Sequence, residues 1–166
     1  MLFPALNADL TLDPKGRVTL PRTLRNAVGQ LGLNRLVAFA NGGPKRGLAL
    51  VKIDDYQAMA DTNIASHPMD PRSRLFALAV ASTAQTVTID GNGRLLIPPS
   101  LRNLLGFERD LYLFTAGSWI EVWDRARWDQ QFSEAASQWD DLFGFGALQT
   151  SSSAAPNEHG SVGGDG

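Results

Sequence analysis

Two short segments, 13–17 and 90–94, share the pattern Asp-x-x-Gly-Arg. An arginine that directly follows a turn glycine presents a planar guanidinium, which can form paired hydrogen bonds with a phosphate or with the edge of a guanine base. The same arginine could instead pair with the aspartate of its own turn, or with the equivalent aspartate of the other segment. Arg17 and Arg94 are therefore candidate DNA contacts, with a structural ion pair as the open alternative.

Further cations accompany these segments. Lys15 stands at the tip of the first turn, where it can reach a phosphate. Arg25 and Arg102 follow the segments at matching positions, and for them an ion pair with the turn aspartate is as good an interpretation as a DNA contact. The candidate DNA-binding residues are Lys15, Arg17, Arg22, Arg25, Arg94 and Arg102. The candidate turn and ion-pair residues are Asp13, Gly16, Asp90 and Gly93.

The charge of the chain is unevenly distributed. The formal net charge is -2, which is unusual for a nucleic-acid-binding protein. Residues 1–50, however, carry seven Lys and Arg against two Asp. Because the field near a surface follows the local charge within a Debye length, a basic stripe on an acidic chain can still bind phosphate.

Nothing in the sequence indicates an enzyme. The chain has no cysteine and two histidines, and it contains no metal-ligand spacing, no serine-histidine-aspartate order and no phosphate-binding loop. Asp13 and Asp90 could imitate paired catalytic carboxylates, but capping of the two turns explains them more simply. We expect no cofactor, no metal and no small-molecule substrate.

The elements that carry these residues are repeated along the chain. Residues 10–29 and 87–106 align at a constant offset of 77 positions, and their Asp, Gly-Arg, Pro, Leu-Arg-Asn and final Gly recur in register. Each copy reads as a strand, a turn, a second strand and a short helix that begins near the proline. Gly29 is the expected C-cap of the first helix.

Each copy continues into a predicted β-hairpin and then a helix. The hairpin strands lie near 36–39 and 48–53 in the first copy, and near 111–114 and 119–123 in the second. The helices that follow are expected near 55–61 and 125–143, and a linker helix over 71–84 has Asp70 as its N-cap.

These segments predict a modular organisation. We expect a first module over 1–62, a linker with its helix over 63–85, a second module over 86–148 and a disordered Gly/Ser-rich tail over 149–166. Trp128 is expected to pack on its own module, whereas Trp139 and Phe143 are candidates for an oligomer interface, since tryptophan is enriched in such surfaces. The chain shows no signal peptide and no apolar run long enough to cross a membrane, so we expect a soluble, cytoplasmic protein. If the candidate residues bind DNA, we also expect it to be associated with the nucleoid.

The two motifs resemble the tandem motif of the MraZ family. The first copy reads Asp13-x-Lys15-Gly16-Arg17-x-x-x-Pro21-x-x-x-Arg25, and the second reads Asp90-x-x-Gly93-Arg94-x-x-x-Pro98-x-x-x-Arg102. The string Ile120-Glu121-Val122-Trp123-Asp124-Arg125-x-x-Trp128 after the second copy also resembles that family. One copy would fit any AbrB-like protein, whereas two copies with this ending resemble MraZ over roughly residues 8–132.

The resemblance implies a fold and a function. The fold would be mainly β with short helices, an α+β protein in which two AbrB-like swapped-hairpin half-barrels interlock as a pseudo-dimer within one chain. Family members assemble into ring-shaped homo-oligomers and bind tandem direct repeats in double-stranded promoter DNA. They usually repress the division and cell-wall gene cluster, often including their own gene. Two alternatives remain open, an AbrB-like antitoxin and a scaffold that binds only protein.

Overall fold

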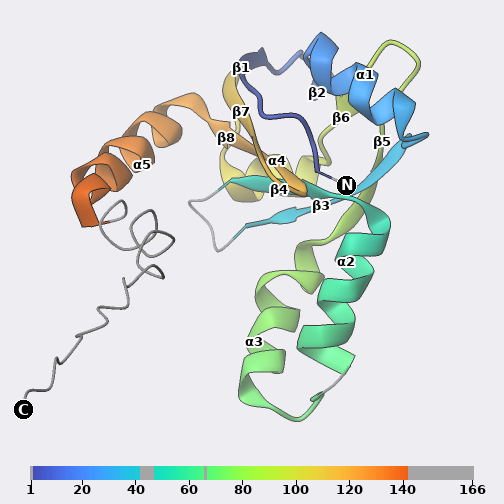
Figure 1. The fold of residues 1–166 in the computed structure, drawn as a ribbon, viewed down its shortest axis with the longest axis vertical. Coiled ribbons are helices and arrows are strands. Elements are labelled where there is room, and N and C mark those ends of the chain that lie inside the picture. The colour runs from blue at the N-terminus through green and yellow to red at the C-terminus, as the bar shows by residue number, and fades with distance from the viewer. Residues whose placement is uncertain (1, 42–46, 66, 142–166) are drawn as a thin grey trace, which may run out of the picture. The chain divides into compact units, whose positions relative to one another are not determined.

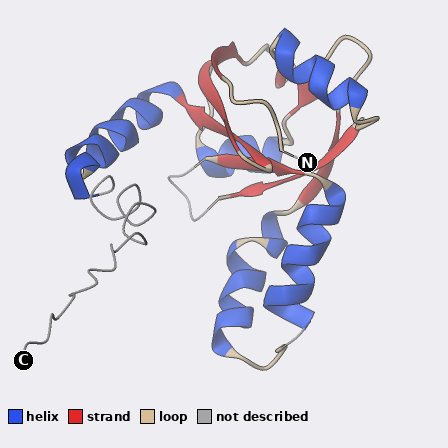
Figure 2. Cartoon of the chain, viewed as in Figure 1, coloured by secondary structure: helices blue, strands red, loops and turns tan. Residues whose placement is uncertain are grey.

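The computed structural model describes residues 2–41, 47–65 and 67–141. The first copy contains β1 (Asn7–Thr11), β2 (Arg17–Thr19), α1 (Arg22–Gln30), β3 (Arg35–Ala40), β4 (Leu48–Val51) and α2 (Ile53–Ala60). The second contains β5 (Gln85–Thr88), β6 (Arg94–Leu96), α4 (Pro99–Leu105), β7 (Asp110–Ala116), β8 (Trp119–Asp124) and α5 (Arg125–Ser137). Between them lie a π-helical turn (Asp61–Ala65), α3 (Pro71–Ala79) and a 3₁₀ turn (Ala81–Thr83) (Figures 1 and 2). The predicted tail over 149–166 falls outside the described residues.

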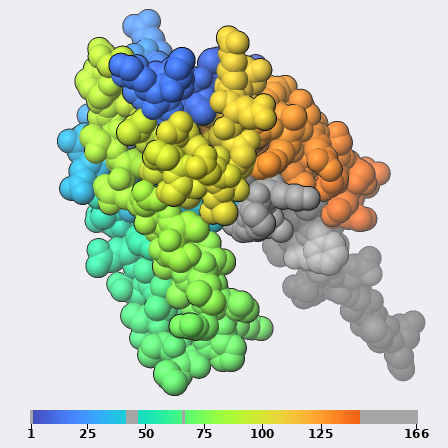
Figure 3. Space-filling view, turned by 180° about the vertical axis from the view of Figure 1, so that it is seen from behind, coloured from blue at the N-terminus to red at the C-terminus, as the bar shows by residue number. Residues whose placement is uncertain are grey.

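The strands of the two copies interlock. In the six-stranded antiparallel sheet, ordered β1-β7-β8-β4-β3-β5, the first strand of each copy pairs with the third strand of the other. Leu10 lies opposite Leu111, and Val87 lies opposite Leu36. The surface shows the same exchange, because blue atoms of the N-terminal region border yellow atoms of the second copy (Figure 3). The predicted α+β fold of two swapped hairpins in one chain is confirmed.

A second, two-stranded sheet joins β2 to β6 and is called here the central ribbon. Val18 and Leu95 face each other at its centre, so the ribbon has an approximate two-fold axis at that pair. The backbone N–H of Leu20 donates to the carbonyl of Gly93, and that of Ile97 donates to Gly16, both at 2.9 Å. The ribbon therefore ties each turn glycine to the strand of the other copy.

One hydrophobic core fills the space between the two copies. Its buried side chains include Val18 and Leu24 from the first copy and Leu95 and Leu101 from the second, each at most 1% exposed. Burying a side chain of this size contributes roughly 1.5–3 kcal/mol relative to leaving it in water. The strands that carry Val18 and Leu95 pair with each other, and Leu24 and Leu101 come from the helices that follow them, so both copies contribute to one core.

Helices cover the outer faces of the hairpins. Tyr56 of α2 packs against Phe39 of β3, with ring centroids 6.0 Å apart. On the second hairpin, Trp128 of α5 stacks on Tyr112 at 4.6 Å and contacts Phe114 at 4.9 Å. This contact confirms the prediction that Trp128 packs on its own module.

Three predicted helix ends differ from the structure. Gly29 is not a C-cap, because α1 continues through Gln30 and the left-handed residue is Gly32, with φ of +64°. The linker helix predicted over 71–84 ends at Ala79. After it, Thr83 donates to the carbonyl of Val80 and accepts from the N–H of Ala40, which joins the linker to the sheet. The last helix was predicted near 125–143; α5 ends at Ser137, residues 139–141 are helical again after a turn at Gln138, and 142–143 lie outside the described residues.

The chain divides into two compact units, Met1–Asp129 and Gln130–Gly166. Within the second unit, Phe132 and Trp139 meet edge to face at 6.5 Å. None of the helices in the described part of the chain combines the length and the apolarity that crossing a bilayer requires.

Candidate nucleic-acid interface

Each Asp-x-x-Gly-Arg segment folds into a tight turn closed by its own aspartate. One carboxylate oxygen of Asp13 accepts the backbone N–H groups of Lys15 and Arg17, at 2.9 and 2.8 Å. The other oxygen accepts the Nε–H of Arg17 at 2.8 Å. Such a turn needs a left-handed residue, which Gly16 supplies with φ of +82°.

The second turn repeats this geometry. Asp90 accepts the backbone N–H groups of Asn92 and Arg94, both at 2.9 Å, and the Nε–H of Arg94 at 2.9 Å. Gly93 is the left-handed residue, with φ of +73°. Both arginines thus pair with the aspartate of their own turn, and not with the equivalent aspartate of the other copy.

The hydrogen bonds favour the ionised form of both aspartates. The backbone N–H of Arg17, followed by its side chain, lowers the pKa of Asp13. The backbone N–H of Arg94 likewise lowers the pKa of Asp90. Each ion pair occupies the Nε–H of its arginine, which is one of the five N–H donors of a guanidinium. The pairing therefore orients the arginine without consuming its capacity to bind an anion.

The central ribbon places these arginines on one exposed face. Alternation along the strands buries Val18 and Leu95, so their neighbours point outward. On that face Arg17 lies opposite Leu96, and Thr19 lies opposite Arg94. A two-stranded β-ribbon has the dimensions to enter the major groove of DNA.

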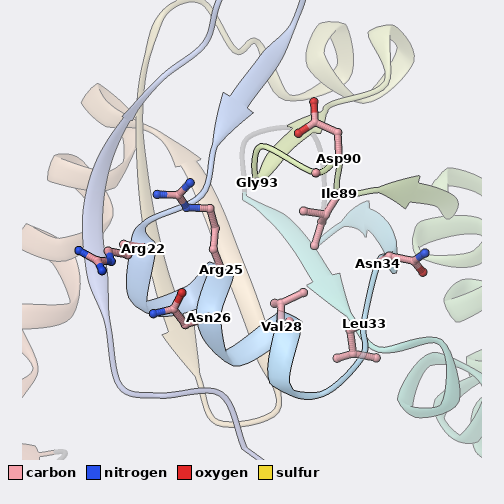
Figure 4. A pocket seen from close by; sticks show the side chains of 11 residues that line it. Arg22, Arg25, Asn26, Val28, Leu33, Asn34, Ile89, Asp90 and Gly93 are labelled. Carbon is pink, nitrogen blue, oxygen red and sulfur yellow. The ribbon is translucent and has the colours of Figure 1, made fainter.

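A hollow of about 640 Å³ lies between the helix of the first copy and the turn of the second. Arg22, Arg25 and Asn26 line it from α1, and Asp90 and Gly93 line it from the other copy (Figure 4). The hollow related by the pseudo-two-fold axis is lined by Asp13, Pro14 and Arg102, among others. The six candidate DNA-binding residues thus lie on the ribbon, its turns and the two helices that follow it.

The two halves of this surface differ in charge. Lys15 and Arg22 are exposed in the first copy, where the second copy has Asn92 and Pro99. The second copy instead exposes leucines: Leu96 is 49% exposed and Leu104 is 42% exposed. The first half is therefore the more cationic one.

Arg25 and Arg102 lie against the glycines of the opposite turns. A Cβ added to Gly93 would stand 1.8 Å from Cδ of Arg25, and one added to Gly16 would stand 2.4 Å from Cζ of Arg102. Sequence reasoning missed this crossed contact. The matched offset of the two arginines and the two glycines, taken together with the hairpin swap that the family resemblance implies, was the available signal.

A buried carboxylate was also missed. Glu121 is 8% exposed and accepts N–H groups from Trp119 at 3.0 Å, Trp123 at 2.8 Å and Asn41 at 3.1 Å. Residues at alternate positions of a strand share a face, so the two tryptophans flanking Glu121 were a detectable signal. In the described residues no group of three or more His, Cys, Asp or Glu is arranged to hold a metal ion.

Comparison with known proteins gives one consistent result. Residues 80–141 match the family model described as "MraZ protein, putative antitoxin-like". The chain is 35% identical over 129 residues to "Transcriptional regulator MraZ" of Dechloromonas aromatica (strain RCB), an alignment that covers 78% of this chain and 86% of the relative.

Two further relatives bear the same name. The protein of Bordetella pertussis is 34% identical over 129 residues, covering 78% of this chain and 87% of the relative. The protein of Thermomicrobium roseum is 33% identical over 128 residues, covering 76% and 85%. Transcriptional regulators are a non-enzymatic class, and on that ground the prediction that the chain is not an enzyme is confirmed.

Proposed function

Because the chain belongs to the MraZ family, we propose that it is a transcriptional regulator that binds double-stranded DNA through the central ribbon and the turns beside it. The observation that carries the proposal is the pairing of Arg17 with Asp13 and of Arg94 with Asp90, on the two sides of one two-fold ribbon. Held in this way, each guanidinium is preorganised for an anion or a base edge.

Four of the six candidate residues are assigned to two roles. Arg17 and Arg94 stand on the ribbon itself, and we assign them to the base edges and the phosphates beside them. Lys15 and Arg22 are exposed next to the ribbon and serve as phosphate contacts, which position the protein without reading sequence. Arg25 and Arg102 lie beside the turns, where they border the same surface.

The proposed target is the promoter of the division and cell-wall gene cluster that includes the protein's own gene, with repression as the effect. A ring of copies, each presenting one ribbon, would match tandem direct repeats in that promoter. Linking several weak sites in one ring raises the overall affinity, because each later contact is intramolecular.

A binding titration tests this function. A labelled duplex from upstream of the gene and a shuffled duplex of equal length are titrated with the full-length protein at a fixed salt concentration. We expect the upstream duplex to bind at least about a thousandfold more tightly. The Arg17→Ala, Arg94→Ala double variant should lose this preference, and Arg74→Ala, on the exposed surface of α3, should retain it.

Two other results point elsewhere. Equal, weak binding to both duplexes would contradict sequence-specific regulation and favour the alternative of a scaffold that binds only protein. A toxin gene adjacent to this gene, with a toxin that binds the purified protein, would favour the antitoxin. In that case the cluster promoter would not be the target.

A further inference from the structure

Arg102 of α4 lies across a glycine of the opposite copy. A Cβ built on Gly16 would stand 2.4 Å from Cζ of Arg102 and 2.6 Å from its Nη1. The guanidinium therefore occupies the space that any side chain at Gly16 would need. It packs against one side of the turn that ends at Arg17.

The guanidinium of Arg102 is itself anchored. Its Nε–H donates to the carbonyl of Ile97 at 3.0 Å. The N–H of the same Ile97 donates to the carbonyl of Gly16 at 2.9 Å. Arg102, Ile97 and Gly16 thus contact one another: the arginine is held by Ile97, the residue after β6, and packs on the turn that precedes β2.

The pseudo-two-fold axis repeats the packing of an arginine on a turn glycine, although the hydrogen bond that the arginine makes is different. A Cβ on Gly93 would stand 1.8 Å from Cδ of Arg25. Nη1 of Arg25 donates to the carbonyl of Asn92 at 3.3 Å, across 67 positions of sequence. The helix arginine of each copy is thus in contact with the turn of the other copy.

We propose that Arg102 is a positioning residue for Arg17 and that Arg25 is one for Arg94. Glycine has more conformational freedom than any other residue, so a side chain packed on Gly16 or Gly93 narrows the geometries open to the turn beyond what the hydrogen bonds of the aspartate impose. The crossed arginine supplies that contact. The helix of one copy thereby sets the geometry of the DNA-binding turn of the other, and the inference rests on the function proposed above.

Hydrogen–deuterium exchange of the full-length protein tests the crossing without DNA. In Arg102→Ala we expect amide exchange in 13–17 to rise by about fivefold while exchange in 90–94 is unchanged, since local opening is reported by local exchange. Arg25→Ala should give the reverse pattern. Arg74→Ala should change neither segment, and unchanged exchange in β4 and β8 shows that the sheet is intact. Equal changes in both turns, or changes confined to the turn of the same copy, would overturn the proposal.

A double-mutant cycle on DNA affinity tests the consequence. We expect Arg102→Ala to weaken binding by about tenfold alone and by about the same factor in an Arg94→Ala background. In an Arg17→Ala background its further effect should be under about twofold, since it acts through Arg17. Additivity with Arg17→Ala would show that Arg102 acts independently.

Arg102→Lys separates positioning from a direct phosphate contact. Lysine keeps the charge but lacks the planar group that lies on Gly16 and the Nε–H that donates to Ile97. We expect Arg102→Lys to resemble Arg102→Ala, with faster amide exchange in 13–17 and weaker DNA binding than the wild type. Full affinity in this variant would contradict positioning. If the wild-type protein binds no DNA, the proposed function fails, but the exchange pattern still decides whether the crossed contact sets the turns.

Discussion

Arg17 donates both its backbone N–H and its Nε–H to the two carboxylate oxygens of Asp13, each at 2.8 Å. Asp90 and Arg94 repeat the arrangement on the other side of the central ribbon. These bonds favour the charged aspartate and lower its pKa in the folded protein, chiefly through the backbone N–H. We therefore expect the turns that carry the proposed DNA contacts to lose stability in acid.

We predict that the two aspartates contribute to acid unfolding. A folded-state pKa below the unfolded value of about 3.9 gives stability that is complete above that value and is lost as the pH falls through the folded pKa. The melting temperature of the wild-type protein should therefore fall more steeply below about pH 4 than that of the Asp13→Asn, Asp90→Asn variant. Asp140→Asn, an exposed aspartate elsewhere, should follow the wild type. Identical acid profiles for all three proteins would contradict this prediction.

The repeat made most of the fold predictable. Turn residues such as Asp13 and Gly16 recur at a fixed offset. In both copies they separate two strands in the same order of strand, turn and strand. The position of Gly29 misled the prediction of the first helix end, because α1 has nine residues and α4 has seven. Gly106, its counterpart, is the left-handed C-cap of α4. Matching sequence positions thus need not have matching roles when one helix is longer.

The crossed arginines could not be predicted from local pattern. Local reasoning offers Arg25 and Arg102 the aspartate of a turn as a partner, because a charge pair is the simplest contact for an arginine. The hairpin swap instead places each arginine on a glycine of the other copy. The contact of Glu121 with Asn41 was hidden for a similar reason, since the two residues lie 80 positions apart.

Removal of the Glu121 carboxylate should destabilise the fold. Three N–H donors, from Asn41, Trp119 and Trp123, converge on this side chain. Leaving a buried donor unpaired costs about 1–3 kcal/mol, so Glu121→Leu should lower the free energy of unfolding by at least that amount. Urea denaturation followed by tryptophan fluorescence measures the change. Glu134→Leu, an exposed glutamate on α5, is the matched control, and an equal loss there would show that the carboxylate network has no special role.

We predict a homo-oligomer of more than two chains. The two copies already satisfy each other within one chain, so further association should be heterologous and close into a ring. Trp139, 48% exposed on the second unit, is one candidate contact, and Phe143, the other, falls outside the described residues. Light scattering in moderate salt should give a large species for the wild type and a smaller one for Trp139→Ser. Met69→Ser removes a side chain that is 93% exposed and should leave the mass unchanged. A wild-type protein that is only monomeric would refute this prediction.

The first copy should dominate DNA binding. Its turn and helix offer Lys15, Arg17, Arg22 and Arg25, whereas matching positions of the second copy offer two cations, Arg94 and Arg102. Each phosphate that a cation neutralises releases condensed counterions, so most of the salt dependence of binding should come from the first copy. Arg17→Ala should therefore weaken binding more than Arg94→Ala. In a ring the difference in affinity should be larger, because the same contact is lost in every subunit that engages the DNA.

The variant Lys15→Ala separates the electrostatic contribution to DNA binding from the recognition of the DNA sequence. The plot of log affinity against log salt should flatten by about one unit for each phosphate that the variant no longer neutralises, with the preferred sequence unchanged. Asn92→Lys, which restores the missing cation to the second turn, should steepen the slope by a similar amount. If Arg94→Ala proves as damaging as Arg17→Ala, the asymmetry is wrong. If Arg17→Ala unfolds the protein by circular dichroism, Arg17 acts chiefly by holding Asp13, and the cations beside it carry the binding.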